Sequence, residues 1–116
     1  MKPLTKSRFK LGLGCPNKLH FTSKKEYANQ SLDDSFLQAL AKGGFQVEAL
    51  ARLHYPNGVF VDTENYEYDL ATNITQNNLG QENIALYEAA FEYEGLFIRT
   101  DILSKKGNHI KLIEAK

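Results

Sequence analysis

The C-terminal part of the chain restricts the fold most. Residues 84–93 are rich in β-forming side chains and contain neither proline nor glycine, and Gly95 follows as a turn residue. Further β-forming runs at 96–103 and 110–115 flank the pair Gly107-Asn108, which is typical of a two-residue hairpin turn. The pattern predicts three consecutive antiparallel strands.

The N-terminal segment carries a short helical pattern instead. Thr5 stands where a helix N-cap is expected, and apolar residues follow at helical spacing until glycines and Pro16 end the pattern. Residues 17–32 are polar and are predicted to form mainly a loop.

A longer helix is predicted to begin at Asp33 or Asp34 and to present a wide apolar face. Gly43-Gly44 interrupts it, so it forms either two pieces or a site of close backbone approach. A short strand at 59–61 follows, and then an amphipathic helix at 64–77 that carries Tyr66, Leu70 and Ile74 at four-residue steps. This order predicts an α+β fold, with helices packed on one face of a small mixed sheet.

The 116 residues are expected to form a single domain, 1–116. The formal net charge is zero, but residues 1–25 hold seven Lys and Arg and no acid, whereas 26–101 hold thirteen acids. This distribution suits contact with a polyanion through the basic segment and cation binding in the middle. Ordinary solvated charge explains it equally well.

One cysteine excludes an internal disulfide, and no apolar run approaches the length of a membrane span, so a cytoplasmic location away from membranes is expected.

The last hairpin brings charged residues together. With a two-residue turn, counting outward along the strands places Asp101 opposite Glu114, and Lys116 shares their face. Two adjacent carboxylates repel each other unless a cation lies between them, and Mg²⁺ prefers such oxygen ligands. Alternatively, Lys116 pairs with these acids in a surface salt bridge. Glu88, in the neighbouring strand, either joins the site or faces solvent.

Three stretches resemble a known family: Leu4–Phe9 with Gly14–Leu19, Gly44–Leu50, and Ile84–Phe91 with Ile98–Leu103 and Leu112–Lys116. In order along the chain, they are similar to the RecB-like branch of the PD-(D/E)xK nuclease superfamily, in particular to the CRISPR-associated exonuclease type and a related bacterial family of unknown function. The resemblance implies a restriction-endonuclease-like core.

This resemblance implies a metal-dependent DNA nuclease that uses Mg²⁺ or Mn²⁺. Glu48, Asp101, Glu114 and the carbonyl of Ala115 are the implied metal ligands, and Asp101, Glu114 and Lys116 are the implied catalytic residues. A non-catalytic nucleic-acid-binding module on a degenerate nuclease fold is the alternative. In both cases the basic opening segment is expected to contact DNA phosphates, through Lys6, Arg8 and Lys10.

Two departures from the family pattern change the expectation. The sequence ends on the motif lysine, where the family continues with a helix and a strand. An inactive N-terminal fragment is therefore predicted. We expect it either to self-associate through the strand at 110–115 or to have poorly ordered last residues. Cys15 matches the first of four cysteines that hold an iron–sulfur cluster in many relatives. A lone cysteine cannot hold a cluster, so a cluster is expected only in a longer parent protein, and Cys15 is predicted to be a small buried residue.

Overall fold

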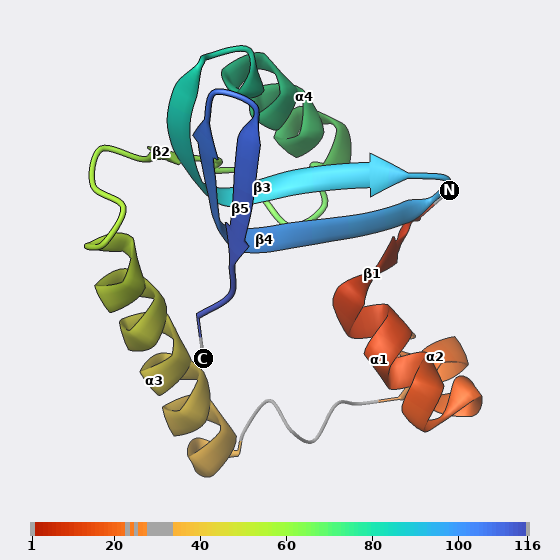
Figure 1. Cartoon of the computed structure of the whole chain (residues 1–116). Helices are drawn as coiled ribbons and strands as arrows, with labels where there is room; N and C mark the ends of the chain where they lie inside the picture. The colour runs from red at the N-terminus through yellow and green to blue at the C-terminus, as the bar shows by residue number, and fades with distance from the viewer. Residues whose placement is uncertain (1, 23, 25, 28–33, 116) are drawn as a thin grey trace.

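The structure is a computed structural model that describes residues 2–22, 24, 26–27 and 34–115. It confirms the α+β fold, with helices around a five-stranded mixed sheet (Figure 1). The predicted antiparallel array consists of β3 (Asn83–Tyr93), β4 (Leu96–Lys106) and β5 (His109–Ile113). Two short strands complete the sheet, because β1 (Leu4–Thr5) pairs in parallel with β4 and β2 (Val59–Phe60) pairs in parallel with β3.

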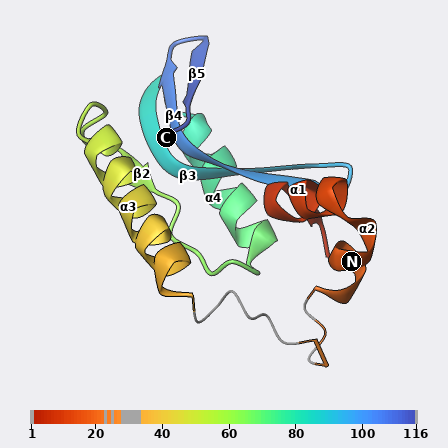
Figure 2. The same ribbon diagram turned by 90° about the horizontal axis from the view of Figure 1, so that it is seen from below.

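The predicted register of the last hairpin is confirmed. Lys106 pairs with His109 around the two-residue turn, and the ladder ends at the pair Ile102–Ile113. The residues after β5 leave the ladder, so the strand is shorter than predicted. Figures 1 and 2 show that β3 and β4 bend strongly along their length.

The N-terminal segment forms two helices rather than one helix and a loop. Thr5 caps α1 (Lys6–Gly14), because its hydroxyl accepts a hydrogen bond from the Arg8 amide at 3.3 Å. After one extended residue, α2 (Pro16–Phe21) begins with proline in its first turn, where the missing N–H costs nothing. The loop prediction was wrong here because a polar composition does not prevent a helix. Cys15, between the two helices, is exposed, so its predicted burial was also wrong.

The helix predicted from Asp33 or Asp34 is α3 (Ser35–Arg52), and Asp34 is its cap. One carboxylate oxygen of Asp34 accepts from the first free amides of the helix. The helix continues through Gly43-Gly44 without a break, and open space surrounds the positions where their Cβ atoms would lie. Neither alternative for this glycine pair is therefore correct.

Small side chains set the packing of α4 (Tyr68–Leu79), which begins later than predicted. Ala71 and Thr75 are fully buried on its inner face. The prediction had instead turned the larger residues one position earlier, Leu70 and Ile74, toward the sheet. Thr75 donates to the Ala71 carbonyl and accepts from the Ala90 amide on β3, both at 2.9 Å. These contacts hold α4 against β3, where Val61, Phe97 and the clustered residues Leu86, Ala89 and Leu103 complete the core.

Two apolar surfaces of the structure are exposed, one on α3 and one on β5. On α3 the exposed large residues are Phe36, Leu37, Leu40, Phe45, Val47, Leu50 and the adjoining Leu53. On β5, Ile110 and Leu112 are 57% and 62% exposed. Periodicity identifies an apolar face but not the element that covers it, and no described element packs along α3. Among the described residues, no helix combines the length and apolarity needed to cross a bilayer.

Candidate metal centre

Three carboxylates from separate elements converge at the bend of the sheet. Glu48 comes from α3, Glu88 from β3 and Asp101 from β4, and each offers an oxygen within 4.8 Å of the other two. All three residues are partly buried. Carboxylate oxygens at this spacing are the donor set that Mg²⁺ and Mn²⁺ prefer, so these side chains fit a divalent cation.

The sheet register accounts for the closeness of Glu88 and Asp101. The flanking pairs are Tyr87–Ile102 and Ala89–Thr100, so Glu88 lies across from Asp101. No ladder pairing forms between these two residues, because Glu88 adopts a φ of 60° within β3. A positive φ in a strand is unusual for any residue except glycine and costs on the order of 1–3 kcal/mol. The strain coincides with the carboxylate group.

A tyrosine positions the end of α3 beside the sheet. The Tyr87 hydroxyl donates to the Tyr55 carbonyl and accepts from the Gly58 amide at 3.2 Å. A Cβ on Gly58 would lie 2.3 Å from the Tyr87 ring, so only glycine allows this approach. The loop after α3 is thereby fixed to β3, and Glu48 is carried toward Glu88.

Arg52 forms ion pairs with two of the three carboxylates. Its Nη2 lies 3.6 Å from Glu48 Oε2 and 3.7 Å from Glu88 Oε1. The guanidinium also lies over the Phe60 ring, 4.7 Å from its centroid, and near the Tyr87 ring. One arginine thus partly compensates two of the three carboxylates.

Burial raises the pKa of Glu88 above the ordinary glutamate value, and the nearby charge of Glu48 raises it further. Arg99 and Arg52 oppose this rise, and Asp101 adds a weaker upward contribution. The direction follows because the half-buried carboxylate faces two like charges. A divalent cation would lower the pKa of Glu88 again, because its charge would compensate all three acids.

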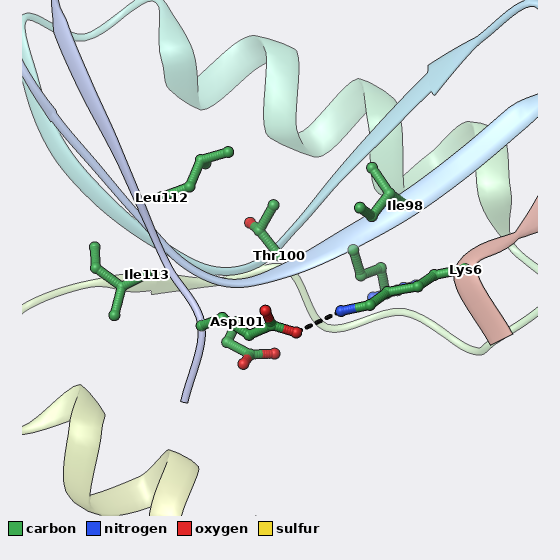
Figure 3. Close-up of a pocket in the computed structure, with 8 residues that line it drawn as sticks. Lys6, Ile98, Thr100, Asp101, Leu112 and Ile113 are labelled. Atoms are coloured by element: carbon green, nitrogen blue, oxygen red, sulfur yellow. Dashed lines mark hydrogen bonds and ion pairs between the residues drawn. The ribbon is translucent and has the colours of Figure 1, made fainter. Parts of the chain in front are cut away.

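Asp101 also contacts the residues that follow the last hairpin. Its Oδ2 accepts a hydrogen bond from the Ala115 amide at 2.7 Å. Glu114 lies outside the three-carboxylate group and pairs with Lys6 at 2.5 Å between Oε1 and Nζ. In Figure 3, Lys6 from α1 and Asp101 from β4 point toward the same space, which is a pocket of about 240 Å³ lined also by Glu114 and Thr100.

Of the implied metal ligands, the structure brings Glu48 and Asp101 together. Glu114 borders the same pocket as Asp101, and the Ala115 backbone contacts Asp101. Lys116 lies outside the described residues. The basic residues Lys6, Arg8 and Lys10 all belong to α1, but only Lys6 reaches the pocket.

Glu88 is the residue that hairpin counting did not assign. The count used for Asp101 and Glu114 also works across the turn at Gly95, where it sets Glu88 opposite Asp101. The sequence therefore carried this signal, but the choice between a buried and an exposed face needed the position of α3.

The chain matches no protein-family model, and neither a curated protein nor a solved structure is found to be similar to it.

Proposed function

We propose that this chain carries the catalytic core of a metal-dependent DNA nuclease of the PD-(D/E)xK type. The observation that supports the proposal most directly is the convergence of Glu48, Glu88 and Asp101, whose oxygens lie within 4.8 Å of one another. The strained backbone at Glu88 adds support, because strain of this kind concentrates at functional sites.

The three carboxylates would hold Mg²⁺ or Mn²⁺. A bound divalent cation polarises the scissile phosphate and lowers the pKa of water, which supplies the nucleophile for phosphodiester hydrolysis. Asp101 is held in position by the Ala115 amide. Glu114 stands at the adjoining pocket and is proposed as a further ligand. Lys116 is proposed to orient the attacking water, as the family resemblance implies.

DNA is proposed to reach the site along α1. Lys6 lines the pocket beside Asp101, and its ammonium group pairs with Glu114 at the same pocket. Together with Arg8 and Lys10 it would contact phosphates, which provide sequence-independent affinity. The proposal includes a cytoplasmic location, where such a substrate is accessible.

A second candidate is a DNA-binding module that has lost catalysis. The contact of Arg52 with Glu48 and Glu88 favours it, because an internal cation can stabilise these acids without a metal. In this case the carboxylates are structural, and α1 alone carries the interaction with DNA.

Cleavage of linear single- and double-stranded DNA by the full-length protein separates the two candidates. The nuclease proposal predicts cleavage with Mg²⁺ or Mn²⁺, none with EDTA, and loss of at least 100-fold in rate for Glu88→Gln combined with Asp101→Asn. Glu92→Gln, on the exposed end of β3, is the matched control and keeps full activity. DNA binding without divalent-dependent cleavage would favour the binding module.

A further inference from the structure

Arg52 occupies the edge of the carboxylate group from the same helix as Glu48. The two residues are one helical turn apart on α3, and Arg52 reaches past Glu48 to Glu88 on β3. Its side chain is 25% exposed. The position makes Arg52 a bridge between the helix and the sheet.

The guanidinium is held mainly by charge and by aromatic faces. Its distances of 3.6 and 3.7 Å to the two carboxylates are ion-pair distances and exceed the usual length of a hydrogen bond. Phe60 and Tyr87 lie beside it as ring contacts, and its buried Nε has no hydrogen-bond partner among the described residues. Few directed hydrogen bonds therefore fix the guanidinium. Few such bonds would have to break when a cation displaces it.

We propose that Arg52 is the resident counter-ion of Glu48 and Glu88, and that a divalent cation binds by displacing the Arg52 charge from these two carboxylates. This inference rests on the metal site proposed above. The carboxylates that Arg52 faces belong to two of the three candidate ligand residues, so guanidinium and metal compete for the same negative charge. Without metal, Arg52 relieves the repulsion among the acids. With metal, its positive charge disfavours binding.

Titration calorimetry with Mn²⁺ on wild type and Arg52→Gln tests the displacement. The variant is expected to bind Mn²⁺ about tenfold more tightly, because a positive charge within about 4–6 Å of a charged group shifts its equilibria by this order. Lys42→Gln removes one charge from an exposed position of the same helix and is expected to bind like wild type. Unchanged or weaker binding in Arg52→Gln, with binding in wild type, overturns the displacement and leaves the metal site standing. Absence of binding in both proteins rejects the metal site itself.

Thermal unfolding without metal tests the counter-ion role separately. Arg52→Gln is expected to unfold several degrees below wild type, and Mn²⁺ is expected to raise its midpoint by more than it raises that of wild type. Adding Glu88→Gln to Arg52→Gln removes the uncompensated charge and is expected to recover part of the lost stability. If Arg52→Gln does not fold, this double variant decides: recovery supports the counter-ion, and continued failure to fold overturns it.

Discussion

Glu88 and Asp101 lie across from each other on β3 and β4 at the one place where the ladder between these strands is interrupted. Glu88 reaches this position with a φ of 60°, and a third acid, Glu48, approaches from α3. Backbone strain and clustered like charge both destabilise a fold. Their coincidence at one point is the physical basis of the proposed cation site.

Without metal, the stability of the protein is expected to fall as pH rises above the acidic range. The pKa of Glu88 is raised in the folded state above its ordinary value of 4.5, so folding favours the protonated form. Its contribution is complete below the unfolded-state pKa and is lost as pH rises through the folded-state pKa. Glu88→Gln should flatten this part of the pH profile. Urea unfolding of both proteins in EDTA between pH 4 and pH 8 measures the difference, and parallel profiles would contradict the account.

Much of the fold follows from local signals. The cap residues Thr5 and Asp34 mark helix starts, and the Gly107-Asn108 turn sets the last hairpin. These signals act over a few residues and depend little on the remainder of the chain. Pro16 carried the same kind of signal for α2, but the polar composition around it concealed the helix.

Contacts between segments far apart in the chain were harder to predict from the sequence. The inner face of α4 depends on small residues such as Ala71 that fit against β3, and hydrophobicity alone favours their larger neighbours. Asp101 was identified from strand alternation, whereas Glu88 needed the position of α3 to be recognised as a partner. The sequence shows only that Arg52 follows Glu48 by four residues on the helix. Its contacts with Glu88 and the two rings span distant segments and left no local signal.

Gly58→Ala is expected to destabilise the protein by about 1–3 kcal/mol, the usual cost of overpacking. The added Cβ would lie 2.3 Å from the Tyr87 ring and would separate the loop after α3 from β3. Chemical denaturation measures the loss, and Mn²⁺ affinity should fall with it because Glu48 is carried by the same segment. A stability equal to that of wild type would show that Tyr87 does not anchor this loop.

Gly44→Ala is expected to have the opposite effect and to stabilise the protein by about 0.5–1 kcal/mol. Gly44 lies within α3 with open space around its Cβ position, and alanine has a higher helix propensity than glycine by roughly this amount. The measurement is the urea midpoint, and a decrease would indicate that α3 contains a break at the glycine pair.

Thr75→Val is expected to cost about 1–3 kcal/mol, because it leaves the buried Ala90 amide without its acceptor. The side chain keeps its volume, so the effect reports the hydrogen bond between α4 and β3. Thr72→Val, at a partly buried position of the same helix whose hydroxyl bonds only within α4, is the control and should cost less. Equal losses would mean that the Thr75 bridge adds nothing.

Lys6→Gln is expected to weaken DNA binding with little effect on stability. The Lys6–Glu114 pair is about half exposed, and such pairs contribute about 0–1 kcal/mol. Loss of one phosphate contact should reduce the slope of log affinity against log salt by about 1. Fluorescence anisotropy across a salt series measures the slope, and an unchanged slope would remove Lys6 from the DNA contact.

The most direct test of the account is a calorimetric titration of the chain with Mn²⁺, comparing wild type, the Glu88→Gln/Asp101→Asn double variant and Glu92→Gln. One saturable site is expected in wild type and in Glu92→Gln, and a loss of about 100-fold in affinity is expected in the double variant, since two of its carboxylate ligands are gone. Equal Mn²⁺ affinity in wild type and the double variant, or no binding to wild type, would contradict the metal centre at Glu48, Glu88 and Asp101.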